Sequence, residues 1–253
     1  MTGSCTTTGA VRELHLFDKK TLPNVSMVNN VVNLTLTKPR SYQARAKRLK
    51  RLWLGMAVAA FFGTLLAGYL AWPLSPPDLG VGNRLLTSGL LASWRDGNVV
   101  VLVRHEERCD RSSNPCFGPA DGLTIHGTQQ AKEIGKAFKT LGMESADILS
   151  SPTTRTAQTS QFMFGKTLLS PGPLAICGDA MGEEILSHKQ PGRNLVLITH
   201  SACINDFEQA LGYPHAVTAE YGSALFVEVL GNGHFKTLGI MNSEDWSAAI
   251  KQL

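Results

Sequence analysis

Apolar residues from Asn98 onward are gathered into short, nearly continuous runs. Runs of this length and composition are typical of strands that are buried on both faces of a sheet. They predict three strands: Asn98–Val103, Ala146–Ser151 and Asn194–His200. A fourth segment, Ala224–Ile240, has two apolar runs around a central Gly-Asn-Gly and therefore predicts a β-hairpin.

Amphipathic segments lie between these runs and predict helices. In His126–Gly142, apolar residues recur every three or four positions, which is the spacing of a helix with one buried face, and His126 is a candidate cap. Further helices are predicted over Thr153–Phe164, over Ala180–Lys189 and from His200 to about Leu211. This alternation predicts an α/β fold: a three-layer sandwich with a mostly parallel central sheet and helices on both faces.

An uncharged stretch of twenty residues, Trp53–Trp72, stands apart from this pattern. It is long enough to cross about 30 Å of hydrocarbon as one helix, and tryptophans at both ends are typical of membrane interfaces. The basic run Arg45–Arg51 precedes it, which by the positive-inside rule favours a cytoplasmic N-terminus. The sequence therefore predicts one transmembrane helix that is kept as a signal anchor, and the alternatives are a cleaved secretory signal and a buried helix.

These features divide the chain into four parts. Residues 1–52 form a basic tail without sustained periodicity, which is expected to be disordered and cytoplasmic. Residues 53–72 are the predicted span, residues 73–83 a linker rich in Pro and Gly, and residues 84–253 the folded domain. The start of translation stays open, since Met27 is a second candidate.

The net charge of +4 is unevenly distributed along the chain. Residues 1–52 hold ten of the 24 Lys and Arg residues but only two of the 20 acidic residues, so the remainder of the chain is net acidic. The basic character therefore belongs to the tail, and the folded domain is not expected to bind nucleic acid.

Four of the five cysteines lie beyond the predicted span: Cys109, Cys116, Cys177 and Cys203. An even number of cysteines in an exported domain predicts disulfides, and four cysteines allow three pairings. We favour Cys109–Cys116, which closes a short loop, together with Cys177–Cys203, which ties two segments expected near the same site. Free buried thiols are the alternative. The spacing of these residues from His105 matches no compact zinc pattern, so no metal site is predicted.

The predicted strands end in basic and imidazole side chains. Arg104 and His105 follow the first strand. Arg155 follows the second strand after a short turn, and His200 ends the third. Ligands of α/β sheets gather at the carboxyl ends of strands, so these residues are expected to converge, together with Arg108. A phosphate suits such a cluster, because guanidinium groups and helix N-termini bind it well, and a neutral imidazole beside it predicts a phosphohistidine intermediate.

Three segments, LVRHEERCD, LSSPTTRTAQT and LVLITHS, together resemble the motifs of the histidine phosphatase superfamily, which has a phosphoglycerate-mutase-like fold. The resemblance runs in order over residues 98–240. It implies that His105 is the phosphorylated nucleophile, that Arg104 and Arg155 bind the phosphate, and that His200 is the second histidine. Arg108 matches an additional arginine of the phytase-like branch. No metal or other cofactor is expected.

Within this superfamily, the chain most resembles the lipopolysaccharide core heptose(II)-phosphate phosphatase group. RHEERCDRSSNPC, GLTIHGTQQAKEIGKAF, CGD and the cysteine three residues after His200 carry this resemblance. It implies a domain on the periplasmic side of the bacterial inner membrane, acting on a phosphorylated sugar of the lipopolysaccharide core. One residue departs from the superfamily pattern: Glu106 replaces the usual glycine, and it is expected either to orient Arg108 or to disfavour highly charged substrates.

The leaving alkoxide of a sugar phosphate needs a proton, which commonly comes from a carboxylic acid. One branch of the superfamily places an aspartate directly after the second histidine, but this position holds Ser201. Asp179, Glu183 and Glu184 lie in the segment where the other branch keeps its acid, and they are the candidates. Each is equally compatible with a solvated carboxylate at the start of a helix.

The sequence as a whole predicts a single-pass membrane phosphatase that hydrolyses a phosphomonoester through a phosphohistidine. Two alternatives stay open. One is a phosphohistidine or protein phosphatase of the same fold, and the other is a non-catalytic envelope module that binds phosphorylated glycolipid.

Overall fold

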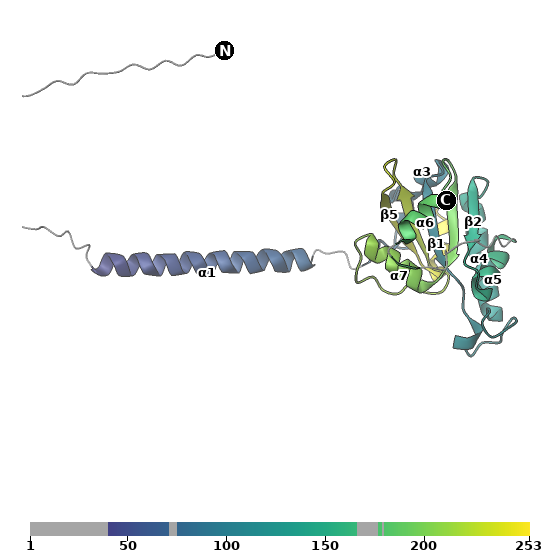
Figure 1. The fold of residues 1–253 in the computed structure, drawn as a ribbon, viewed down its shortest axis with the longest axis horizontal. Helices are drawn as coiled ribbons and strands as arrows, with labels where there is room; N and C mark the ends of the chain where they lie inside the picture. The colour runs from purple at the N-terminus through teal and green to yellow at the C-terminus, as the bar shows by residue number, and fades with distance from the viewer. Residues whose placement is uncertain (1–39, 71–74, 166–176, 179) are drawn as a thin grey trace, which may run out of the picture. The chain divides into compact units, whose positions relative to one another are not determined.

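The computed structural model of the chain describes residues 40–70, 75–165, 177–178 and 180–253. The chain divides into two compact units between Leu65 and Leu66. The first element is helix α1, Arg40–Leu70 (Figure 1). Its segment Arg45–Tyr69 is long and apolar enough to cross a membrane, with a mean hydropathy of 1.7. A signal sequence can meet the same criterion, so α1 is weak evidence for a membrane span.

Helix α1 begins earlier than the sequence pattern predicted, at Arg40 rather than at Trp53. Residues 40–52 are therefore helical and not part of a disordered tail. The cause is their composition, since Ala, Arg, Lys, Leu and Gln are strong helix formers and neither Pro nor Gly interrupts them. Residues 1–39 and Trp72 lie outside the described residues.

The second unit is built on a five-stranded sheet. Its strands are β1 Val99–Arg104, β2 Ala146–Ser150, β3 Asn194–Thr199, β4 Ala224–Val229 and β5 Phe235–Met241. Their order across the sheet is β2-β3-β1-β4-β5. Strands β2, β3 and β1 are parallel, whereas β4 is antiparallel to both β1 and β5. The sheet is therefore mixed: the predicted parallel arrangement holds for β2, β3 and β1, and the predicted hairpin is β4 with β5.

Both faces of the sheet are covered, and strand β1 shows why its sequence requires this. Val99, Val101 and Val103 belong to one hydrophobic cluster, while Val100 and Leu102 belong to another. All five side chains have no exposed surface. The continuous apolar run of β1 thus encodes a strand that needs a layer of helices on each side.

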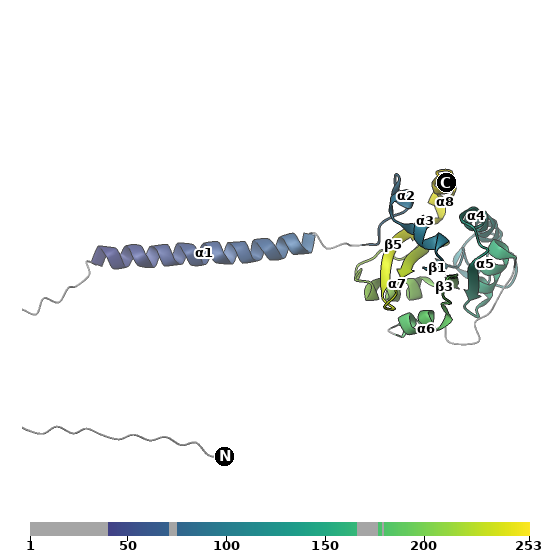
Figure 2. The ribbon, with the colours of Figure 1, turned by 90° about the horizontal axis from the view of Figure 1, so that it is seen from above.

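The described helices supply these two layers (Figure 2). One face is covered by α2 Arg84–Thr87, α3 Leu90–Arg95, α4 Ile125–Leu141, α5 Thr154–Phe164 and α8 Trp246–Ile250. The other face is covered by α6 Met181–His188 and α7 Ser201–Ala210. The domain is a three-layer sandwich, as predicted. The sequence pattern missed α2, α3 and α8, because four to six residues are too few to establish a helical period.

Helix α4 illustrates two local determinants. Its N-cap is Thr124, whose Oγ1 accepts a hydrogen bond from the backbone N–H of Gly127 at 2.9 Å, so the candidate cap His126 was wrong. Thr124 is the better cap because a short hydroxyl side chain reaches the free N–H groups of the first turn. Further along, Gly135 lets α4 approach α5 closely, since a Cβ at this position would lie 2.2 Å from the carbonyl oxygen of Met163.

The register of the parallel strands brings their carboxyl ends to one edge of the sheet. Arg104 of β1 is paired with Thr199 of β3, and Ser150 of β2 is paired with Ile198 of β3. The residues that directly follow these strands, His105, Ser151 and His200, are consequently neighbours in space. Two 3₁₀ helices, Cys109–Arg111 and Ser243–Asp245, complete the described elements.

Candidate active site

A cavity of about 310 Å³ lies at this carboxyl edge of the sheet. It is lined by Arg104, His105, Arg108, Arg111, Arg155, Cys177, His200, Ser201, Ala202 and Tyr221. Five of the site residues predicted from the sequence lie together on this wall: Arg104, His105, Arg108, Arg155 and His200. They come from β1, α5 and the loops that follow β1 and β3.

His105 is held with one ring nitrogen free of a proton. Its Nδ1 is 2.8 Å from the carbonyl oxygen of Glu106, and since a carbonyl can only accept, Nδ1 donates this hydrogen bond. The other nitrogen, Nε2, accepts a hydrogen bond from Nε of Arg155 at 3.2 Å. His105 is therefore a neutral imidazole whose Nε2 lone pair points toward the arginines. That is the state required of a nucleophile.

Arg155 contacts both histidines. Its Nη2 lies 3.3 Å from Nδ1 of His200, and Nε2 of His200 lies 3.0 Å from the hydroxyl oxygen of Ser151. Because the guanidinium can only donate, Nδ1 of His200 accepts and Nε2 carries the proton. The two imidazole rings lie edge to face, with centroids 5.4 Å apart. Arg155 thus positions both rings from the first turn of α5.

Arg104 is anchored on one side and open on the other. Its Nη1 donates to the carbonyl oxygen of Ala219 at 2.6 Å, and its Cζ lies 4.0 Å from the centroid of the Tyr221 ring. Its Nε is buried and has no hydrogen-bond acceptor among the described residues. A buried guanidinium N–H without an acceptor favours binding of an anion at this position.

Two further arginines, Arg108 and Arg111, lie on the same wall. Arg108 forms an ion pair with Asp110 through Nε and Nη2, and this pair raises the pKa of Arg108. Burial, followed by the charge of Arg108, lowers the pKa of Arg155. The cavity therefore concentrates positive charge, which an anion would relieve.

The first turn of α7 also opens onto the cavity. Ser201 and Ala202 line it, and the helix begins at Ser201 without a side-chain cap. Backbone N–H groups at the start of a helix, together with the positive end of the helix dipole, bind phosphate groups. The site thus combines two neutral imidazoles, several guanidinium groups and a helix N-terminus.

Burial keeps both imidazoles neutral. It lowers the pKa of His105 to about 3, with a further decrease from His200 and Arg155 that a hydrogen bond to the Glu106 carbonyl partly offsets. It also lowers the pKa of His200 to about 4, assisted by the charges of Arg155, Arg108 and Arg104. At neutral pH, neither ring adds a positive charge to the site.

This neutrality gives a prediction for the free protein. The ring C–H signals of His105 and His200 in an NMR titration are expected to stay at their neutral-imidazole positions between pH 8 and pH 5, with protonation only below that range. In urea, the unfolded chain should titrate near pH 6.5, the ordinary pKa of histidine. Protonation of either ring near pH 6.5 in the folded protein would contradict the assigned neutral state.

Two of the three general-acid candidates do not line the described wall of the cavity. Glu183 and Glu184 begin α6 but do not line the cavity, and Oε1 of Glu184 lies 3.1 Å from Nε2 of His188. Asp179 lies outside the described residues.

Glu106 also differs from its expected role. Its side chain is buried and close to Gly222, and burial raises the pKa of its carboxyl group to about 7. It does not orient Arg108, whose partner is Asp110.

Both favoured disulfides are present, Cys109–Cys116 and Cys177–Cys203. The first closes the loop that carries Arg111. The second joins Cys177, on the cavity wall, to Cys203 in α7. Each disulfide therefore holds a segment that contributes to the site.

Sequence analysis missed Tyr221 and Arg111 as cavity residues. Tyr221 follows no predicted strand, and it is placed by the loop before β4, where its ring lies 5.7 Å from that of His105. Arg111 could have been found, because it stands inside the predicted Cys109–Cys116 loop, directly after the motif that contains His105.

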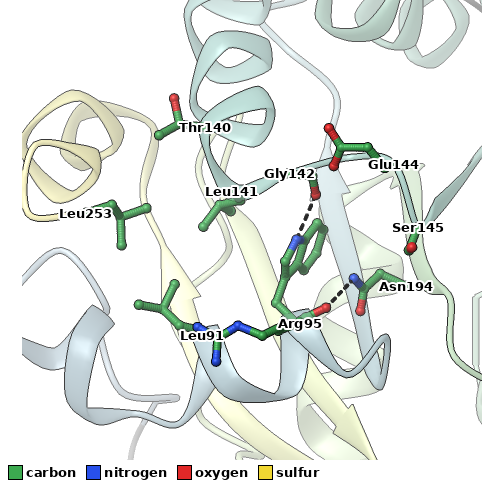
Figure 3. Close-up of a pocket in the computed structure, with 10 residues that line it drawn as sticks. Leu91, Arg95, Thr140, Leu141, Gly142, Glu144, Ser145, Asn194 and Leu253 are labelled. Carbon is green, nitrogen blue, oxygen red and sulfur yellow. Dashed lines mark hydrogen bonds between the residues drawn. The ribbon is translucent and has the colours of Figure 1, made fainter.

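A larger cavity, of about 380 Å³, lies at the opposite end of the sheet (Figure 3). There, Nε1 of Trp94 donates to the carbonyl oxygen of Gly142, and the amide of Asn194 donates to the carbonyl oxygen of Trp94, both at 2.8 Å. Among the described residues of its wall, Arg95 is the one basic residue, and there is no histidine and no cysteine. These groups offer no nucleophile of the kind described above, so we place the candidate active site at the arginine-rich cavity. In the part of the chain that the structure describes, no group of three or more His, Cys, Asp or Glu side chains is arranged to hold a metal ion.

The chain is similar to curated proteins of Escherichia coli called lipopolysaccharide core heptose(II)-phosphate phosphatase, including those of strains E24377A and K12 / DH10B. It is 43% identical to them over 109 residues, which is 42% of this chain and 54% of the relatives. The chain thus spans about half the length of the curated relatives that it matches. No protein-family model matches the chain. The similarity confirms the resemblance identified from the sequence motifs.

Solved structures with a similar fold include phosphoglycerate mutase from Bacillus anthracis, with a TM-score of 0.47 and 15% identity over 61% of this chain and 98% of that chain. The putative phosphohistidine phosphatase SixA from Agrobacterium tumefaciens has a TM-score of 0.44 and 16% identity over 57% of this chain and 97% of that chain. At these TM-scores, neither likeness carries an inference about the activity of the chain.

Proposed function

We propose that the chain is a phosphomonoester hydrolase that works through a phosphohistidine on His105. The single observation that carries this proposal is the geometry around Arg155, which donates to the unprotonated nitrogens of both His105 and His200. A phosphate bound among the arginines would lie against two neutral imidazoles. The 43% identity with the Escherichia coli relatives supports the same conclusion.

The proposed reaction has two steps, formation and hydrolysis of the phosphohistidine. In the first, Nε2 of His105 attacks phosphorus, an N–P bond forms, and the P–O bond to the leaving group breaks. The leaving alkoxide takes a proton from an acid. In the second, water attacks the phosphorus of the phosphohistidine and gives a proton back to the conjugate base of that acid, the N–P bond breaks, and inorganic phosphate leaves while His105 returns to its neutral state.

The arginines stabilise the transferred phosphoryl group. Arg104 offers its buried Nε–H, and Arg155 can turn its N–H groups from the imidazoles to the phosphate oxygens. His200 donates through Nε2 to Ser151 and lies beside the same position. The arginine N–H groups act on charge that is spread over the phosphoryl oxygens in the transition state, where preorganised donors are most effective.

For the acid, we propose Asp179. In the sequence it stands two residues after Cys177, which lines the cavity. Glu183 and Glu184 are less suited, because neither lines the cavity.

We further propose that the substrate is a phosphorylated sugar of the lipopolysaccharide core, and that the protein is a single-pass protein of the bacterial inner membrane with its catalytic domain in the periplasm. Three features support this location: the length and apolar character of α1, the basic run Arg45–Arg51 at its start, and two disulfides, which persist in an oxidising compartment.

Both activity and substrate can be tested on the full chain purified in detergent. Hydrolysis of p-nitrophenyl phosphate is expected with and without EDTA, and loss of the phosphomonoester signal of lipopolysaccharide core oligosaccharide is expected by ³¹P NMR. A phosphohistidine peptide serves as the competing substrate. A higher kcat/KM for the peptide than for the oligosaccharide would assign the activity to protein dephosphorylation, and no turnover of any of the three would contradict the proposed activity.

A further inference from the structure

A third cavity, of about 300 Å³, is lined by four carboxylate side chains. They are Asp78, Glu208, Glu220 and Glu244, and we call this space the acid-lined cavity. No basic residue stands on its described wall. Its charge is therefore opposite to that of the arginine-rich cavity at the candidate active site, which we call the catalytic cavity.

Glu208 gives the acid-lined cavity its specific character. It belongs to α7 and has no exposed surface, and neither of its carboxyl oxygens has a hydrogen-bond partner among the described residues. Burial raises the pKa of this carboxyl group to about 7. A buried carboxyl group without a partner is costly, and a cationic hydrogen-bond donor removes most of that cost.

The other carboxylates leave the negative charge only partly compensated. Asp78 accepts from the backbone N–H of Gly80 and from the amide of Asn242, which are both neutral donors. Just outside the cavity, burial raises the pKa of Asp245, and so do the charges of Asp78 and Glu244. Glu220 interacts with Arg104, which lines the catalytic cavity. The acid-lined cavity therefore favours a positively charged ligand.

The arrangement suits an organic cation better than a metal ion. Metal ions such as Ca²⁺ need several oxygen ligands at about 2.3–2.6 Å. No group of three acidic, His or Cys side chains within the described residues is close enough to provide them. The carboxylates are instead spread around a space in which Ser75, Thr218 and Asn242 add neutral polar groups. A cavity of this size with a few placed polar groups is typical of small-molecule sites.

We propose that the acid-lined cavity binds the primary ammonium group of a small organic molecule, with Glu208 as its principal partner. An ammonium group brings three hydrogen-bond donors and can pair with Glu208 while the rest of the molecule occupies the cavity. The site does not depend on the proposed phosphatase activity.

The acid-lined cavity and the catalytic cavity share one segment of chain. Ala219 lines the first, and its carbonyl oxygen is the acceptor for Arg104. Two residues later, Tyr221 lines the second and stacks on the same guanidinium. The proposed ammonium site is therefore connected, through the backbone of Ala219, to Arg104 of the catalytic cavity.

The test uses calorimetry on the full chain in detergent with two pairs of probes. Glucosamine and ethanolamine carry the ammonium group, and N-acetylglucosamine and ethylene glycol lack it. At least one amine is expected to bind, and its uncharged counterpart is not. Glu208→Gln, which keeps the shape of the side chain, is expected to weaken amine binding by about tenfold or more, because a charge-assisted hydrogen bond is lost.

Glu133→Gln is the matched control, since Glu133 is exposed on α4 and pairs with Lys136. It should leave amine binding unchanged, and an unaltered thermal midpoint of Glu208→Gln would show that its fold is intact. Three results would each overturn the proposal: equal binding of an amine and its uncharged counterpart, unchanged affinity in Glu208→Gln, or binding of Ca²⁺ but of neither amine.

Discussion

Replacing His105 with alanine is expected to lower kcat/KM for p-nitrophenyl phosphate by roughly 10⁴-fold or more, because the proposed nucleophile is removed. Its Nε2 is the one ring nitrogen of His105 without a proton, and no other described imidazole in the cavity has the same position relative to Arg155. The measurement is steady-state hydrolysis by the full chain, together with acid-quench trapping of labelled phosphate on the protein.

The wild type is expected to carry acid-labile phosphate during turnover, and His105→Ala to carry none. His126→Ala is the matched control, since His126 is exposed at the start of α4, outside the cavity. His105→Gln keeps a side chain of similar size and guards against a simple loss of packing at a buried position. Activity of His105→Ala or of His105→Gln within tenfold of the wild type would rule out the phosphohistidine mechanism.

Arg155→Lys is expected to reduce kcat/KM by roughly 10²- to 10³-fold, even though it keeps the charge. Arg155 donates to His105 through Nε and to His200 through Nη2. A lysine has a single ammonium nitrogen in place of the planar guanidinium, so it cannot place two separate nitrogen donors against the two rings. Weaker inhibition by inorganic phosphate is expected as well, because the same fork would bind the anion.

The control for this substitution is Arg95→Lys, at an exposed position on the wall of the cavity in Figure 3. It is expected to match the wild type. If Arg155→Lys retained activity within about threefold, charge alone would suffice at this position, and the positioning role of the guanidinium would be wrong.

Strands β1 and β3 were readable from the sequence because both of their faces are buried. Their uninterrupted Val, Leu and Ile runs set the strand bounds, and the strand ends then placed Arg104, His105 and His200 at one edge. The motif LSSPTTRTAQT added Arg155 to this cluster of Arg104, His105 and His200. Local pattern and burial agree in these segments, which is why the prediction of the cluster was correct.

The parts that the sequence could not give depend on tertiary packing. Tyr221 enters the site through a loop without periodicity, and the direction of Glu106 was decided by the space beside Gly222 rather than by its neighbours in the chain. A hairpin within the sheet requires one of its two strands to run against β1, so the mixed sheet was implicit in the predicted hairpin even though a mostly parallel sheet was expected; in the structure the reversed strand is β4.

The two disulfides have a practical consequence for anyone who prepares this protein. Neither disulfide lies within a strand of the sheet, but in a reducing cytosol the loop with Arg111 and the segment at Cys177 would lack their covalent tethers. Material produced without oxidation would pass tests of secondary structure while presenting an incompletely enclosed pocket. Expression with export, or refolding under a thiol–disulfide couple, is therefore a precondition for interpreting a negative assay.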